Sequence, residues 1–73
     1  MTHDAEWNAG DLGCGELVLY LRNRLRAMPG KTLKLIATDP GAPMDLPAFC
    51  RMTGDTLLQQ EPSKFSYWIK ARV

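Results

Sequence analysis

The sequence contains one histidine, two cysteines and no long apolar run. His3 lies near the N-terminus, and with only Cys14 and Cys50 beside it the chain lacks the ligand cluster of a metal site. The same shortage excludes a conventional Cys-His catalytic pair, except one formed through an N-terminal arm. No stretch approaches the ~20 apolar residues of a membrane span, and the first residues lack a signal-peptide pattern. We therefore expect a cytoplasmic protein with reduced thiols, without a metal, a cofactor or a membrane partner.

The chain also lacks a marked excess of either charge, since nine basic and eight acidic residues give a formal net charge of +1. Domains that bind nucleic acid usually carry a clear basic excess, so we expect no direct nucleic-acid partner. Hydrophobic residues make up 45% of the chain and charged residues 23%, which is typical of a folded globular domain. The length predicts a single domain, residues 1–73, with a thin core.

Two amphipathic helices are predicted from the spacing of apolar residues. The first spans Glu16 to Met28 and ends at Pro29-Gly30, because proline cannot continue a helix and glycine readily turns the chain. Its apolar side is spaced by four, four and three residues: Leu17, Leu21, Leu25 and Met28. The second spans about Pro43 to Thr53, with Pro47 tolerable only near its start. Its apolar side holds Leu46, Phe49, Cys50 and Thr53.

Alternating apolar and polar residues predict strands over residues 4–9, 31–38, 55–61 and 65–73. The resulting order is β-α-β-α-β-β. Two helices cover only one face of four strands, which predicts an α+β fold, a two-layer α/β sandwich with a four-stranded mixed sheet. The last strand should bury Phe65, Tyr67, Ile69, Ala71 and Val73. The open face should carry Lys34, Ile36, Trp68, Lys70 and Arg72.

The two cysteines fall in different environments. Cys14 lies in Gly-Asp-Leu-Gly-Cys-Gly-Glu-Leu, where the first helix begins, and unpaired N–H groups there favour a thiolate. Cys50 lies on the apolar side of the second helix, which predicts core packing. A disulfide between them would require a core residue to reach an exposed helix start, so we expect none.

Four separated segments between about Trp7 and Val73 resemble segments of a known protein family. They are the cysteine that opens the first helix, Met28-Pro29-Gly30-Lys31-Thr32-Leu33, Ala37-Thr38-Asp39-Pro40, and Asp45-Leu46-Pro47-Ala48-Phe49-Cys50. Together they resemble the TusA/SirA/YedF family of small sulfur-carrier proteins. The fold of that family has the same β-α-β-α-β-β order. The resemblance implies a sulfurtransferase-like sulfur carrier at most, rather than a complete enzyme.

The resemblance also implies roles for particular residues. Cys14 would accept sulfane sulfur as a persulfide from a cysteine desulfurase or a rhodanese-type donor. It would pass the sulfur to an acceptor protein in tRNA thiolation, cofactor sulfuration or sulfur metabolism. The backbone N–H groups of Gly15, Glu16 and Leu17 would stabilise the thiolate or persulfide. Arg22 and Arg26, one turn apart, are candidates for docking an acidic partner, and we expect a monomer.

The chain departs from the family at its most diagnostic motif. The usual Cys-Pro-x-Pro is here Cys14-Gly15-Glu16-Leu17, while Asn8 and Asp11 replace an aspartate and a glycine further upstream. Gly15 loosens the turn but restores an N–H that proline lacks. The carboxylates of Asp11 and Glu16 oppose a thiolate.

Two alternatives to the sulfur carrier therefore stay open. The first is a non-catalytic protein-interaction or regulatory module with the same fold, which has lost transfer chemistry. The second is nucleic-acid binding on the open sheet face around Trp68, Lys70 and Arg72, which the charge balance disfavours.

Overall fold

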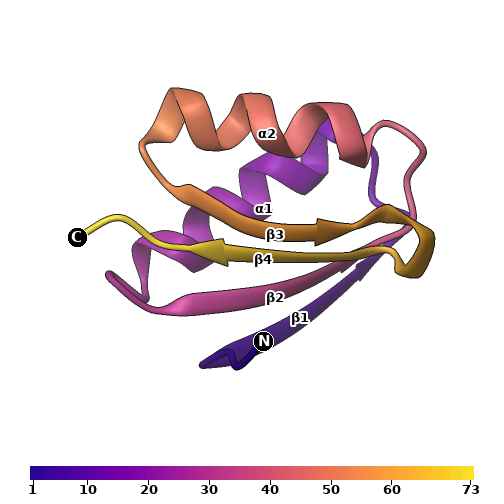
Figure 1. The fold of residues 1–73 in the computed structure, drawn as a ribbon. Coiled ribbons are helices and arrows are strands. Elements are labelled where there is room, and N and C mark those ends of the chain that lie inside the picture. Colours follow the sequence, from indigo (N-terminus) through magenta and orange to yellow (C-terminus); the bar gives the residue numbers. More distant parts are fainter.

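A four-stranded sheet with two helices on one face makes up the fold (Figure 1). The computed structural model describes the backbone of residues 1–73 and every side chain except that of Cys14. The strands are β1 (Ala5–Gly10), β2 (Thr32–Ala37), β3 (Thr56–Glu61) and β4 (Ser66–Lys70), and the helices are α1 (Cys14–Arg26) and α2 (Ala42–Thr53). The sheet order is β1-β2-β4-β3, with β1 parallel to β2 and the other pairs antiparallel. The predicted α+β sandwich and its mixed sheet are confirmed.

The core lies between the sheet and the two helices. Leu17, Leu21 and Leu25 of α1 are all at most 3% exposed, as their spacing of four residues predicts. They face the buried side chains of β2, β4 and α2: Leu33, Leu35, Ala37, Tyr67, Ile69, Ala42, Leu46, Phe49 and Cys50. The predicted apolar sides are therefore confirmed for Leu17, Leu21 and Leu25 of α1 and for Leu46, Phe49 and Cys50 of α2, whereas Thr53 lies outside the core and Met28 is only partly buried.

The helix boundaries differ slightly from the prediction. Helix α1 begins at Cys14 and ends at Arg26, two residues earlier at each end than expected. Helix α2 runs on through Pro47, which the sequence interpretation restricted to the helix start. Pro47 cannot donate a backbone hydrogen bond, but its neighbours Leu46 and Phe49 are buried, and this packing holds the segment helical. At the other end, Gly54 adopts φ +83 and donates to the Cys50 carbonyl, which ends α2.

Strand β4 is shorter than the predicted strand of residues 65–73. Phe65 has φ +54 and is 47% exposed, because it follows the tight turn Pro62–Lys64 rather than continuing the strand. Val73 is fully exposed, because it lies beyond Lys70, the last residue of β4 that pairs with β2. The predicted burial of Phe65 and Val73 was therefore wrong, while that of Tyr67, Ile69 and Ala71 is confirmed.

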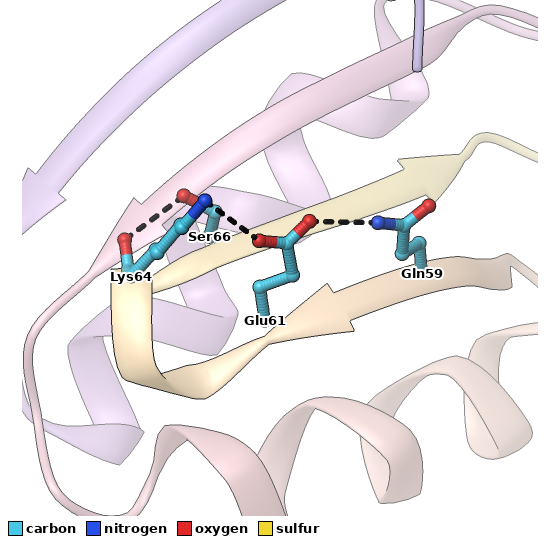
Figure 2. A network of polar contacts seen from close by, with 4 residues as sticks. All are labelled: Gln59, Glu61, Lys64 and Ser66. Carbon is cyan, nitrogen blue, oxygen red and sulfur yellow. Dashed lines mark hydrogen bonds and ion pairs between the residues drawn. The ribbon is translucent and has the colours of Figure 1, made fainter.

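Polar contacts order the connection between β3 and β4 (Figure 2). Lys64 lies 3.7 Å from the Glu61 carboxylate, which accepts a hydrogen bond from the Gln59 amide at 2.8 Å. The Ser66 hydroxyl donates to the Lys64 carbonyl at 2.9 Å. These contacts close the turn that the sequence predicted at Pro62-Ser63-Lys64.

Two residues predicted on the open face of the sheet, Trp68 and Arg72, differ from the prediction. Trp68 and Lys34 face each other across β2 and β4, and the Lys34 ammonium lies 5.5 Å from the centre of the indole ring. Trp68 is only 7% exposed, so it does not offer a free stacking surface for nucleic acid. Arg72 does not join this face, because its guanidinium donates to the Thr53 carbonyl at the end of α2.

Candidate functional site

The turn between β1 and α1 brings the chain to the predicted reactive position. The Asn8 side chain accepts a hydrogen bond from the Gly10 N–H at 2.9 Å, which bends the chain as β1 ends. Gly10 has φ +60, a conformation that glycine adopts without steric cost. Its carbonyl accepts from the Thr38 N–H at 2.9 Å, so the turn is tied to the residue that follows β2. The start of α1 is thereby fixed to the sheet.

The first turn of α1 offers backbone donors beside position 14. Gly13 is the extended residue before the helix, and its carbonyl accepts from the Leu17 N–H at 2.7 Å. The Leu17 N–H was one of three backbone groups predicted to donate a hydrogen bond to the sulfur of Cys14. In the structure it donates to the Gly13 carbonyl within the helix instead. The N–H groups of Gly15 and Glu16 precede the first intrahelical bond and point out of the helix start. The side chain of Cys14 lies outside the described side chains, so its role stays a prediction.

A groove of about 1050 Å³ runs between α1 and α2, and it joins several predicted site residues. Gly15, at the start of α1, lines it together with Arg22 and Arg26 further along the same helix. Phe49 and Met52 of α2 form the opposite wall. Leu17 does not belong to the groove, because it is fully buried in the core, and Glu16 is exposed outside it.

The charges of the groove favour an acidic partner. Three arginines line it, Arg22, Arg26 and Arg72, against two carboxylates, Asp45 and Asp55. Asp55 is engaged within the chain, since its carboxylate accepts from the backbone N–H of Arg72 at 2.9 Å. The groove therefore carries a net positive charge beside exposed apolar surface.

Two exposed residues that line the groove were not predicted as site residues from the sequence. Leu19 is 53% exposed on α1 and Met52 is 86% exposed on α2. Met44, near the start of α2, is also 81% exposed. The exposure of Met52 could have been predicted from helical spacing, because position 52 lies away from the apolar side formed by Leu46, Phe49 and Cys50.

Cys50 is unsuited to thiol chemistry at neutral pH. It is 5% exposed in the core, as predicted. Burial, with a smaller effect of the Asp55 carboxylate, raises the pKa of the Cys50 thiol to about 11. Because the thiolate is the nucleophile, Cys50 stays protonated and unreactive near pH 7.

Neither a metal-binding cluster nor a membrane-spanning helix occurs among the described residues. Among the described residues, histidine, cysteine and carboxylate side chains do not gather in threes as a metal site would need. Neither of the described helices has the length and apolarity that crossing a membrane requires.

Similarity to known proteins identifies the family of this chain. The family model for sulfurtransferase TusA matches residues 6–71. The chain belongs to the TusA family. The sulfur carrier protein TusA of Pseudomonas paraeruginosa is 43% identical over 77 residues, covering 99% of this chain and 98% of the relative.

Other TusA proteins match over similar lengths. The sulfur carrier protein TusA of Pseudomonas syringae is 43% identical over 75 residues, covering 99% of this chain and 89% of the relative. That of Pseudomonas putida is 42% identical over 74 residues, covering 97% and 92%. The resemblance to this family inferred from the sequence is confirmed.

Proposed function

We propose that this TusA-family chain is a small cytoplasmic sulfur carrier that holds sulfane sulfur as a persulfide on Cys14. The observation that supports the proposal best is the groove between α1 and α2. It begins at Gly15, the residue after Cys14, and continues along Arg22 and Arg26. A partner seated in this groove would lie next to the start of α1.

The transfer needs no oxidant or reductant. The Cys14 thiolate attacks the outer sulfur of a persulfide on the donor protein, a new S–S bond forms at Cys14, and the donor's S–S bond breaks. The donor cysteine leaves as a thiolate and takes up a proton. In the second step a thiolate of the acceptor attacks the outer sulfur on Cys14 and returns Cys14 to its thiol form.

The first turn of α1 favours the anionic forms in both steps. The N–H groups of Gly15 and Glu16 and the positive end of the helix dipole stabilise a thiolate or persulfide anion there. The carboxylate of Glu16 opposes this, but it lies on an exposed side chain, where solvent screens its charge.

The arginines of the groove bind the donor. Arg22 and Arg26 face an acidic surface of a cysteine desulfurase or a rhodanese-type protein, while Leu19 and Met52 supply apolar contact. The acceptor is a sulfur-relay protein that serves tRNA thiolation, cofactor sulfuration or sulfur metabolism. A monomer leaves the groove free for these partners.

One observation favours a second candidate, a non-catalytic interaction module. Leu17, which replaces the second motif proline, is fully buried, so the chain uses this position for packing. A module of this kind would keep the groove and its arginines but would not carry sulfur.

Persulfide loading separates the two candidates. The purified chain is incubated with a cysteine desulfurase and cysteine, and its intact mass is recorded. We expect one added sulfur on the wild type and on Cys50→Ser, and none on Cys14→Ser. Absence of the adduct under conditions that load a Cys-Pro-x-Pro relative would refute the carrier and leave the interaction module.

A further inference from the structure

A second cleft lies on the other flank of α1. It has a volume of about 550 Å³ and is lined by Trp7, Leu12, Tyr20, Asn23, Arg24 and Ala27. None of these residues lines the groove between α1 and α2. Helix α1 therefore presents two separate surfaces, one on each side of its buried leucines.

A stacked pair forms the floor of this cleft. The guanidinium carbon of Arg24 lies 4.4 Å above the centre of the Trp7 ring. Trp7 is half-buried and packs against the core from β1, which fixes the ring. Tyr20 lies one turn before Arg24 on α1 and is 48% exposed. The cleft thus offers a cation stacked on Trp7, with the exposed Tyr20 side chain in the same lining.

The charge of the cleft is uncompensated. Its lining residues include no carboxylate, and among the described side chains Arg24 forms no ion pair. Tryptophan, tyrosine and arginine are also the residue types that contribute most to binding energy at protein interfaces. A cationic, aromatic-lined cleft is complementary to an acidic segment that carries an apolar anchor.

The cleft lies close to the proposed reaction. Leu12 precedes Cys14 by two residues, so the cleft reaches the start of α1 from the side opposite the groove. A partner bound in the cleft would leave Arg22 and Arg26 uncovered.

We propose that this cleft is a second docking surface, which binds an acidic segment with an aromatic anchor on the sulfur-accepting protein. Identifying the occupant as the acceptor rests on the proposed function. Donor and acceptor then contact opposite flanks of α1, and sulfur passes between them without the donor first vacating the groove.

A defined peptide tests the cleft. A short peptide of glutamates and aspartates around one phenylalanine is titrated into the nitrogen-15-labelled chain, and amide chemical shifts are followed. We expect saturable shifts at Tyr20, Asn23 and Arg24. Arg24→Glu should weaken binding at least ~10-fold, as loss of an interfacial charge contact does. Tyr20→Ala alters an exposed side chain, so it should weaken peptide binding without perturbing the fold. Arg51→Glu, a charge reversal on an exposed side chain that lines neither surface, should leave binding intact.

Several outcomes would overturn the second surface. They are shifts that do not saturate or that fall only along the groove, equal losses of peptide affinity in Arg51→Glu and Arg24→Glu, and a single-stranded oligonucleotide that binds the cleft more tightly than the peptide does. Peptide release on adding a desulfurase would also overturn it, since the two partners would then share one surface. Sulfur loading of the wild type is measured in parallel. Peptide binding without loading would refute the carrier and keep the cleft, whereas loading without peptide binding would refute the cleft alone.

Discussion

The carboxylate of Asp55 accepts a hydrogen bond from the backbone N–H of Arg72 at 2.9 Å. The Arg72 guanidinium in turn donates to the Thr53 carbonyl at 3.0 Å. Together these bonds join the end of α2 to the segment after β4. They also hold Arg72 in the groove rather than on the open sheet face.

Replacing Asp55 should release this junction. We expect Asp55→Ala to lower the free energy of unfolding by about 1–2 kcal/mol, because it removes the acceptor of the exposed Arg72 N–H and that of the Thr53 hydroxyl. Asp55→Asn keeps one oxygen acceptor, so its free energy of unfolding should fall by less than that of Asp55→Ala. Urea denaturation measures both variants, and equal losses for alanine and asparagine would show that the hydrogen bond is not the cause.

Gly15 allows the missing motif proline to be tested. A Cβ at this position would meet open space, so Gly15→Ala and Gly15→Pro should both fold. Only proline removes the N–H, and we therefore expect a higher Cys14 thiol pKa in Gly15→Pro than in Gly15→Ala. The pH dependence of alkylation, in a Cys50→Ser background, measures this difference. Identical profiles would show that the Gly15 N–H does not stabilise the thiolate.

Charge reversal in the groove should slow sulfur loading. We expect Arg22→Glu and Arg26→Glu each to reduce the rate of persulfide formation with a desulfurase by roughly tenfold or more, most strongly at low salt. Arg51→Glu is the matched control, since Arg51 is exposed on α2 but does not line the groove. A similar loss in all three variants would mean that net charge, rather than the groove, governs the encounter.

Two leucines of α1 provide a test of the core. Leu21 is fully buried, and Leu21→Ala should cost about 2–5 kcal/mol through lost packing and the cavity left behind. Leu19 is 53% exposed, and Leu19→Ala should change the free energy of unfolding by less than about 0.5 kcal/mol. Thermal or urea unfolding compares them directly. A large loss in Leu19→Ala would place that side chain in the core instead of the groove.

The buried thiol of Cys50 should make stability depend on pH in alkaline solution. The pKa of this thiol rises from its ordinary value of 9.0 to about 11 in the folded chain. Below pH 9 the thiol is protonated in both states. Between pH 9 and 11 only the unfolded thiol ionises, so the free energy of unfolding falls, by about 2–3 kcal/mol in all.

The comparison with Cys50→Ala isolates this contribution. Other groups, such as Tyr67, whose pKa is also raised by burial, titrate in both proteins. We expect the difference in unfolding free energy between wild type and Cys50→Ala to shrink as the pH rises from about 9 to about 11. Curves that stay parallel over this range would contradict the raised pKa.

Local sequence patterns predicted most of the fold because they record which side chains are buried. The spacing of Leu17, Leu21 and Leu25 places all three on one side of a helix, wherever that helix packs. The ends of β4 were not predictable in this way. Phe65 and Val73 continue the alternation, but the strand ends where its partners β2 and β3 end.

The candidate site could be predicted only in part. The cysteine at the helix start and the spacing of Arg22 and Arg26 are local features, and the sequence contains them. The groove depends on how two helices lie beside each other, so Met52 and Arg72 join it only through tertiary structure. The Leu17 N–H was predicted to donate a hydrogen bond to the sulfur of Cys14, but it donates to the Gly13 carbonyl within the helix.

The burial of Leu17 constrains how this chain can change over evolution. A proline ring would stiffen the start of the helix, whereas here a fully buried leucine side chain anchors it. Restoring proline at position 17 would remove core packing and the donor to the Gly13 carbonyl in one step. Position 15 has room for a proline ring and position 17 does not, so this chain can hold the full Cys-Pro-x-Pro motif only if the surrounding core is repacked with it.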